Sequence, residues 1–109
     1  MASSFKNKTA TIATANTDQT LYTAPPNTSA VVHGLFMANT HASSNVNITL
    51  KLVDSSNSNA ATVILNAVPI PPNTTLSMDK PVNLETGDKL FVQASTTNCE
   101  ITASILELT

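Results

Sequence analysis

Hydrophobic and polar residues alternate along several short stretches of the chain, with the period of two that marks a strand buried on one face. Within residues 46–52, the even positions carry Val, Ile, Leu and Leu, while the odd positions carry Asn, Thr and Lys. Residues 90–95 and 99–105 repeat this alternation. The pattern predicts three strands, and it predicts that Leu50 and Val92 lie in the core.

The remaining stretches are less regular but favour the same kind of structure. Residues 9–15 and 19–23 are rich in Thr and small apolar side chains, and residues 30–39 and 61–68 are mostly apolar. Segments of Pro, Asn, Asp, Ser and Gly, which favour turns, separate these stretches. We count about eight short antiparallel strands at a spacing of roughly ten residues. The sequence therefore predicts an all-β fold, a single small β-sandwich of jelly-roll-like form.

Two similar segments, residues 24–29 and 70–75, each place a Pro-Pro-Asn-Thr sequence before an apolar stretch. Proline lacks the N–H that a sheet ladder needs, so we expect both segments to begin a strand at a sheet edge. Two such starts, one in each half of the chain, fit the doubled Greek key of a jelly roll. The alternative is a chance echo in a chain in which Ser, Thr and Asn supply more than a third of the residues.

The chain of 109 residues has the length of one domain. Residues 1–8 are polar and show no strong pattern, so we expect a flexible N-terminal arm that orders on contact, followed by the sandwich domain in residues 9–109. The first residues lack the apolar run of a signal peptide, and no stretch approaches the roughly 18 apolar residues of a membrane helix. We therefore expect a protein that stays in a reducing cytoplasm and has no membrane partner.

Charged side chains are scarce, at 11% of the residues, and the net charge is −2. All five basic residues are lysines, and they are spread along the chain. Because nucleic-acid binding relies on clustered cations and base recognition leans on arginine, we expect no nucleic-acid partner. A surface covered mainly by hydroxyl and amide groups loses few hydrated charges when it meets another protein, which favours burial against a partner subunit.

The residues that carry catalytic or metal chemistry are few and form no known motif. His33 and His41 have no carboxylate or cysteine at ligand spacing, and a metal site that combines them with Cys99 would depend entirely on the fold. The chain lacks a nucleophile motif such as Gly-x-Ser-x-Gly, and its two glycines cannot form a Gly-rich phosphate loop. We predict that the protein is not an enzyme and holds no metal or cofactor, and that Cys99 is a small core residue.

The aromatic residues are too few to favour a sugar site, because Phe5, Tyr22, Phe36 and Phe91 are the only rings available for stacking. We expect Phe36, which lies inside an apolar run, to be part of the core. Phe91 is out of phase with its apolar neighbours, so it faces either a partner subunit or a second layer of the core.

Leu106 and Leu108 fall on the polar side of the last strand. Apolar residues on both faces of a strand favour burial between subunits. With Phe91, these two leucines form the predicted interface of a homo-oligomer, for which we expect a trimer.

Residues 20–35 contain Leu-Tyr-Thr-Ala-Pro-Pro-Asn-Thr before an apolar stretch, and residues 82–90 read Val-Asn-Leu-Glu-Thr-Gly-Asp-Lys-Leu. With the stretches 46–54, 63–69 and 103–108, these residues resemble small virion structural proteins, decoration or accessory subunits, of tailed bacteriophages. The resemblance covers most of the chain after its N-terminal segment and carries over no binding residue. It implies a particle component with a β-sandwich or jelly-roll fold that is not an enzyme.

The resemblance and the composition together favour a capsid decoration or cement protein that stabilises the phage head. A tail, neck or fibre-attachment component is the first alternative, and a carbohydrate- or receptor-binding module is the second. In each virion role we expect a homo-oligomer bound to other virion proteins, such as the major capsid protein. Assembly is expected in the cytoplasm of a bacterial host.

Overall fold

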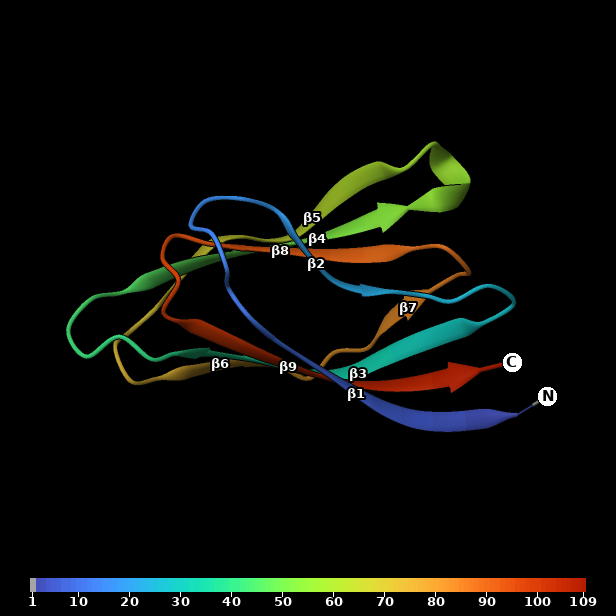
Figure 1. Cartoon of the computed structure of the whole chain (residues 1–109), viewed down its shortest axis with the longest axis horizontal. Coiled ribbons are helices and arrows are strands. Elements are labelled where there is room, and N and C mark those ends of the chain that lie inside the picture. The colour runs from blue at the N-terminus through green and yellow to red at the C-terminus, as the bar shows by residue number, and fades with distance from the viewer. Residues whose placement is uncertain (1) are drawn as a thin grey trace.

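The computed structural model describes residues 2–109 and folds them into two antiparallel sheets that face each other (Figure 1). The elements are β1 Ser3–Thr11, β2 Gln19–Thr23, β3 Ser29–Asn39, β4 Val46–Asp54, the 3₁₀ turn η1 Ser55–Asn57, β5 Ala60–Ile70, β6 Thr75–Met78, β7 Val82–Leu84, β8 Lys89–Ala94 and β9 Cys99–Leu108. Within this part of the chain, no helix is long and apolar enough to cross a membrane.

The strand order is that of a jelly roll. Sheet A has the order β1-β9-β3-β6, with β7 also paired to β3, and sheet B has the order β2-β8-β4-β5. Because β6 and β7 both pair with β3, they act as one interrupted strand. The first strand then pairs with the last and the second with the last but one, and the nesting continues inward to the β4–β5 hairpin. This nesting is the doubled Greek key of a jelly roll, so the predicted all-β sandwich is confirmed.

The core lies between the two sheets and is built from alternate residues of each strand. Leu50 and Val92 have no exposed surface and lie opposite each other in β4 and β8, as the alternation predicts. Cys99 is buried as well, at the start of a row in β9 that points into the core. Full burial of one large apolar side chain contributes about 1.5–3 kcal/mol, so these inward rows are the main source of stability.

The apolar run that forms β3 changes phase part-way along. Val32 faces the core, the pairing with β9 shifts at His33, and Leu35 faces the core again. A β-bulge of this kind moves every later side chain to the opposite face. Phe36 therefore lies on the outer face with 46% of its surface exposed, and the prediction that it lies in the core is wrong. A mostly apolar run has no alternation that could reveal the bulge.

The two Pro-Pro-Asn-Thr segments form similar turns. Asn27 and Asn73 have positive φ angles of 57° and 55°, a conformation that asparagine tolerates better than most residues. In each turn the threonine hydroxyl donates a hydrogen bond to the carbonyl of the second proline, over 3.1 Å. Each turn leads into a strand as predicted, but β3 lies inside sheet A and only β6 is at an edge. The prolines lie in the turn before β3, where they interrupt no ladder hydrogen bond.

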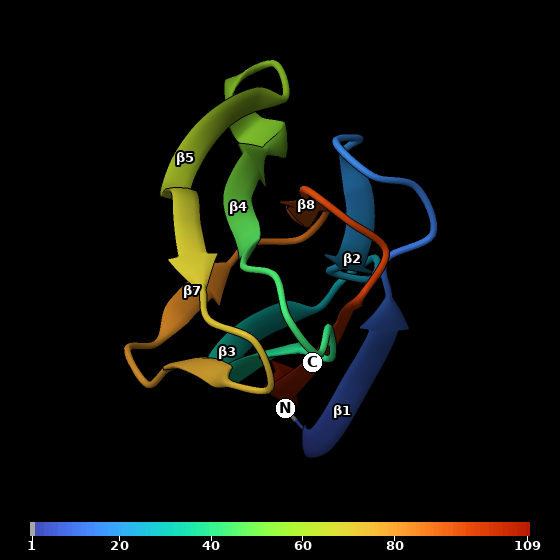
Figure 2. The same cartoon turned by 90° about the vertical axis from the view of Figure 1, so that its left-hand side faces the viewer.

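Strand β1 crosses the domain boundary that the sequence places after residue 8. It pairs with β9 along its whole length, yet Ala10 is its only half-buried residue and all the others are exposed. Figure 2 shows β1 at the margin of its sheet, with no strand of the described chain beyond it. The strand is thus held by backbone pairing with little burial. The flexibility of residues 1–8 in the isolated protein stays a prediction, and residue 1 lies outside the described residues.

Candidate interaction surface

The outer face of sheet A carries apolar side chains at the end where both chain termini lie. Phe5 in β1, Leu106 in β9 and Val31 in β3 form one row across three neighbouring strands. Leu108 lies on the same face of β9, two residues further along. Phe5 is 79% exposed, and the other three are partly exposed. We call these four residues the outer apolar patch.

His33 borders the outer apolar patch. Its ring meets that of Phe5 edge to face, with 6.3 Å between ring centroids and 81° between ring planes. Since β9 lies between the strands of these two residues, the contact reaches across it. The contact therefore keeps the Phe5 ring over sheet A while most of its surface stays exposed.

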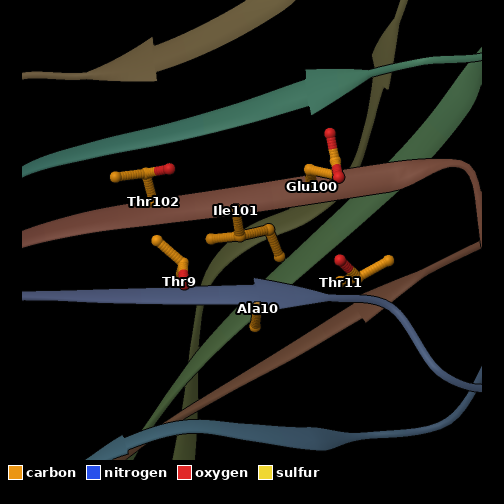
Figure 3. A pocket seen from close by; sticks show the side chains of 6 residues that line it. All are labelled: Thr9, Ala10, Thr11, Glu100, Ile101 and Thr102. Carbon is orange, nitrogen blue, oxygen red and sulfur yellow. The ribbon is translucent and has the colours of Figure 1, made fainter.

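The opposite end of the same β1–β9 pair is polar. Thr9, Thr11, Glu100 and Thr102 project from one side of the two strands and Ala10 and Ile101 from the other, where Ile101 is buried (Figure 3). The four polar residues surround an open depression on the outer face. It contains one charged group and no aromatic ring, so nothing in it selects a particular ligand.

Phe91, the third residue of the predicted interface, lies on the other sheet. It is half-buried on the outer face of sheet B, opposite Thr20 in β2 and Lys51 in β4. The Lys51 Nζ atom lies 3.1 Å from the Asp18 Oδ2 atom, the one ion pair of residues 2–109. The structure therefore brings Leu106 and Leu108 together but separates Phe91 from them. A role for any of the three in an interface stays a prediction.

A side-chain hydrogen bond joins the two sheets at the end of the sandwich where the chain termini lie. The Tyr22 hydroxyl in β2 donates to the Glu107 carboxylate in β9 over 2.5 Å. Burial raises the pKa of the Tyr22 phenol, and the nearby Glu107 carboxylate raises it further. Tyr22 thus stays neutral and is available as a donor that ties β2 to β9.

At one end of the sandwich, Asp88 holds two turns together. It is 3% exposed and accepts hydrogen bonds from the Ser55 N–H and hydroxyl, at 2.9 and 3.0 Å, and from the Glu85 N–H at 2.9 Å. Burial by itself raises the pKa of this carboxyl, but the three hydrogen bonds outweigh it, and the net effect lowers the pKa.

The carboxylates of Asp54, Glu85 and Asp88 come within 4.8 Å of one another. Asp54 accepts from the Ser56 N–H and hydroxyl, so two of the three carboxylates are already occupied by the turns that they shape. We assign the cluster a structural role. The sequence alone does not reveal this cluster, because the three residues come from two turns that only the fold brings together.

The two histidines and the cysteine, which the sequence offers as possible metal ligands, are not part of this cluster. In the part of the chain that the structure describes, no group of three possible ligands includes His33, His41 or Cys99. The His41 Nδ1 atom accepts from the Ser43 and Ser44 N–H groups and shapes its own loop. Burial, with a smaller contribution from the Glu100 charge, raises the pKa of the Cys99 thiol to about 11. Cys99 is therefore a neutral core side chain rather than a ligand or nucleophile.

Comparison with known proteins finds similarity in fold but not in sequence. No protein-family model matches the sequence, and no curated protein matches it. A solved structure of infectious bursal disease virus, Gx strain, aligns over 98% of this chain with a TM-score of 0.55 and 8% identity. A crystal structure of the T13 particle of the same virus aligns over 96% with a TM-score of 0.52 and 12% identity.

This chain spans only about a third of the length of either viral chain, 33% and 30%. A pentameric capsid protein isolated from metagenomic phage sequences aligns over 90% of this chain with 17% identity and a TM-score of 0.46. At these identities the two higher-scoring similarities show a shared fold. The chain therefore shares its fold with part of each of these two viral chains.

Proposed function

We propose that the protein is a non-enzymatic structural subunit of a virion, and that it decorates the capsid of a tailed phage and stabilises the head. The observation that carries this proposal is the outer apolar patch, which leaves four apolar side chains in contact with water on one face of a small jelly roll. A contiguous apolar surface of this kind marks a contact with another protein. The fold shared with a viral particle and the resemblance to small phage virion proteins support the same role.

Within the particle we propose a trimer docked on a lattice of the major capsid protein. Phe91 and the outer apolar patch lie on opposite outer faces of the sandwich, so they serve different contacts. In this arrangement the face around Phe91 meets neighbouring copies, and the outer apolar patch meets the lattice. A low number of charged groups keeps the desolvation cost of both contacts small.

Two aspartate substitutions on the same face of β9 test the docking surface. Leu106→Asp puts a charge inside the outer apolar patch, whereas Thr102→Asp puts the same charge on the exposed polar end of the strand. Particles stripped of the protein should bind the wild type and Thr102→Asp alike, and bind Leu106→Asp at least about tenfold more weakly, the loss of about 1.4 kcal/mol. Equal binding of the two variants would remove the outer apolar patch from the proposal.

The location within the virion needs a second experiment. Particles from the producing cells are separated from free protein by density gradient, and each fraction is assayed for the protein by mass spectrometry. Image reconstruction of the positive fraction should place copies on the head. Copies on the tail or neck would support that alternative, and absence from every particle fraction would contradict the virion role.

A further inference from the structure

Strand β1 leaves a regular row of backbone groups without a partner. Ala2 and Thr109 exchange both of their backbone hydrogen bonds, at 2.9 and 2.8 Å. In an antiparallel pair, residues alternate between those that bond to the neighbour and those that point away from it. Ser4, Lys6 and Lys8 therefore bond to β9, while the N–H and C=O groups of the residues between them point to the free edge. Those edge residues are Ser3, Phe5, Asn7 and Thr9.

The next residue of this row marks where the free edge ends. The Thr11 carbonyl accepts a hydrogen bond from the Gln19 side-chain amide over 3.1 Å, and the same side chain accepts from the Ala13 N–H over 3.0 Å. No corresponding side chain covers the edge of residues 3–9 in the described chain. The open part of β1 is therefore an uninterrupted segment with four donors and four acceptors.

We propose that this edge pairs with the same edge of a second copy of the chain, antiparallel about a twofold axis, so that sheet A continues from one copy into the next. An exposed edge strand is a template for pairing with another chain, and a twofold contact needs only a surface that complements itself. The inference does not depend on the virion role, because it concerns only two copies of this chain.

The two lysines of β1 disfavour some registers of the pairing. Their side chains lie on the inner face of the strand, in the row that bonds to β9. An axis at Lys6 would set this residue directly opposite itself, and an axis at Asn7 would set Lys6 opposite Lys8. Like charges directly opposite are destabilising, whereas an axis at Phe5 sets Lys6 opposite Ser4 and separates the charges.

The register with its axis at Phe5 also suits the outer face. Ser3 then lies opposite Asn7 of the partner subunit, and Phe5 lies opposite Phe5 of the partner subunit. Three pairs of edge residues exchange two hydrogen bonds each, and the two Phe5 residues, whose side chains are 79% exposed in the single copy, lie opposite each other on the outer face. The pairing would also join the outer apolar patches of two copies into one continuous surface.

The choice of a second copy over an unrelated strand rests on this self-complementarity. All of the groups required are present in β1 itself: matching edge groups, an aromatic ring at the axis and lysines that fall opposite uncharged residues. The contact uses none of the surface around Phe91. A twofold contact through β1 and a threefold contact elsewhere can therefore coexist, and they close into a hexamer when their axes cross at right angles.

Cysteine cross-linking tests the register. In the proposed pairing, Ser3→Cys/Asn7→Cys places each new thiol opposite one in the other copy, at the Cα separation of about 5.5 Å that a disulfide accepts. The double variant should form a covalent dimer under mild oxidation, at a yield at least about tenfold above either single variant. The buried Cys99, with its raised thiol pKa, is present in all three proteins as a constant background. Cross-linking of Asn7→Cys alone would indicate the register with its axis at Asn7 and would contradict the proposed one. No cross-linking of the double variant would overturn the proposal.

A proline at an edge position tests the pairing itself. The Asn7 N–H points away from β9, so Asn7→Pro removes a hydrogen bond of the proposed contact and none within the chain. In analytical ultracentrifugation the wild type and Asn7→Ala should double in mass as concentration rises, and Asn7→Pro should stay at the lower mass with an unchanged β-type circular dichroism spectrum. Equal masses for the wild type and Asn7→Pro would contradict the proposal, whether or not the protein binds particles.

Discussion

The two sheets end in edge strands that differ in how they are protected. Strand β5, at the edge of sheet B, is rich in apolar residues, with Val63 49% exposed, and its pairing with β4 is interrupted at two places. At one of these irregularities Ala67 has a φ of +49° and its N–H donates to the Thr49 hydroxyl over 3.1 Å. Pro69 follows two residues later. Strand β1, at the edge of sheet A, is polar, uninterrupted and free of proline.

This difference shows which edge is suited to a partner. Bulges and proline twist or block an edge, and they are common protections of strands that would otherwise aggregate. The apolar β5 has these protections, whereas β1 has only the charges of Lys6 and Lys8 on its inner face. Those charges oppose the registers with the axis at Lys6 or Asn7 and permit the register with the axis at Phe5, so they restrict the pairing rather than prevent it altogether.

The largest expected effect on stability comes from the core next to β5. Leu50 in β4 lies opposite Leu65 in β5 and opposite Val92 in β8. Because Leu50 and Val92 are fully buried, Leu50→Ala or Val92→Ala should lower the free energy of unfolding by about 2–4 kcal/mol. Phe5→Ala, on the exposed edge, is the matched control and should change the stability of the single copy by less than about 0.5 kcal/mol. Urea unfolding at low protein concentration measures all three, and a core loss below that of the control would contradict the assignment of the buried faces.

A smaller effect should come from Asp88, which fixes the turn that leads into β5. In Asp88→Asn one oxygen becomes an NH₂ group that faces an N–H donor, so we expect a loss of about 1–3 kcal/mol at pH 7. Because folding lowers the pKa of Asp88, its stabilisation is present above the unfolded value of about 3.9 and is lost as the pH falls through the folded pKa. Thermal unfolding from pH 7 to pH 2.5 should therefore show the gap between wild type and variant closing below about pH 4. A gap that is constant with pH would contradict this role.

The smallest effect should be a gain in stability at the bulge of β5. Alanine at positive φ is strained, while glycine adopts this conformation without a steric penalty. Ala67→Gly should therefore stabilise the protein by up to about 1 kcal/mol, since strain relief exceeds the added chain entropy. The control is Ala61→Gly, in the same strand but with an ordinary backbone conformation, which should destabilise it. A loss at both positions would mean that Ala67 is not strained.

Alternation predicted the parts of the fold in which one face is buried and the other is wet. It gave the core positions of β4, β8 and β9, and it gave the outward direction of Phe91, Leu106 and Leu108. It failed for Phe36, because a bulge at His33 inside an apolar run leaves no change of pattern to detect. Residues 3–8 of strand β1 were not predicted as strand for the opposite reason: with neither face of β1 buried, its sequence has no reason to alternate.

The candidate surfaces could be predicted only in part, because alternation gives the direction of a side chain but not the order of the strands. The sequence shows that a side chain points out of a strand, but the strand order decides which outward residues meet. Phe5 joins Leu106 because β1 pairs with β9, and Phe91 is separated from both because β8 belongs to the other sheet. The Asp54, Glu85 and Asp88 cluster likewise depends on the approach of two turns that are distant in the sequence.

The central claim, that β1 offers one row of backbone groups to β9 and the other to a second copy, is tested most directly by amide hydrogen exchange measured by NMR. In dilute protein the Lys6 and Lys8 amides should exchange slowly while the Phe5 and Asn7 amides exchange fast. At high concentration all four should be protected, because the second ladder forms. Fast exchange of Phe5 and Asn7 at every concentration would contradict the claim, as would protection of the two amides that does not depend on concentration.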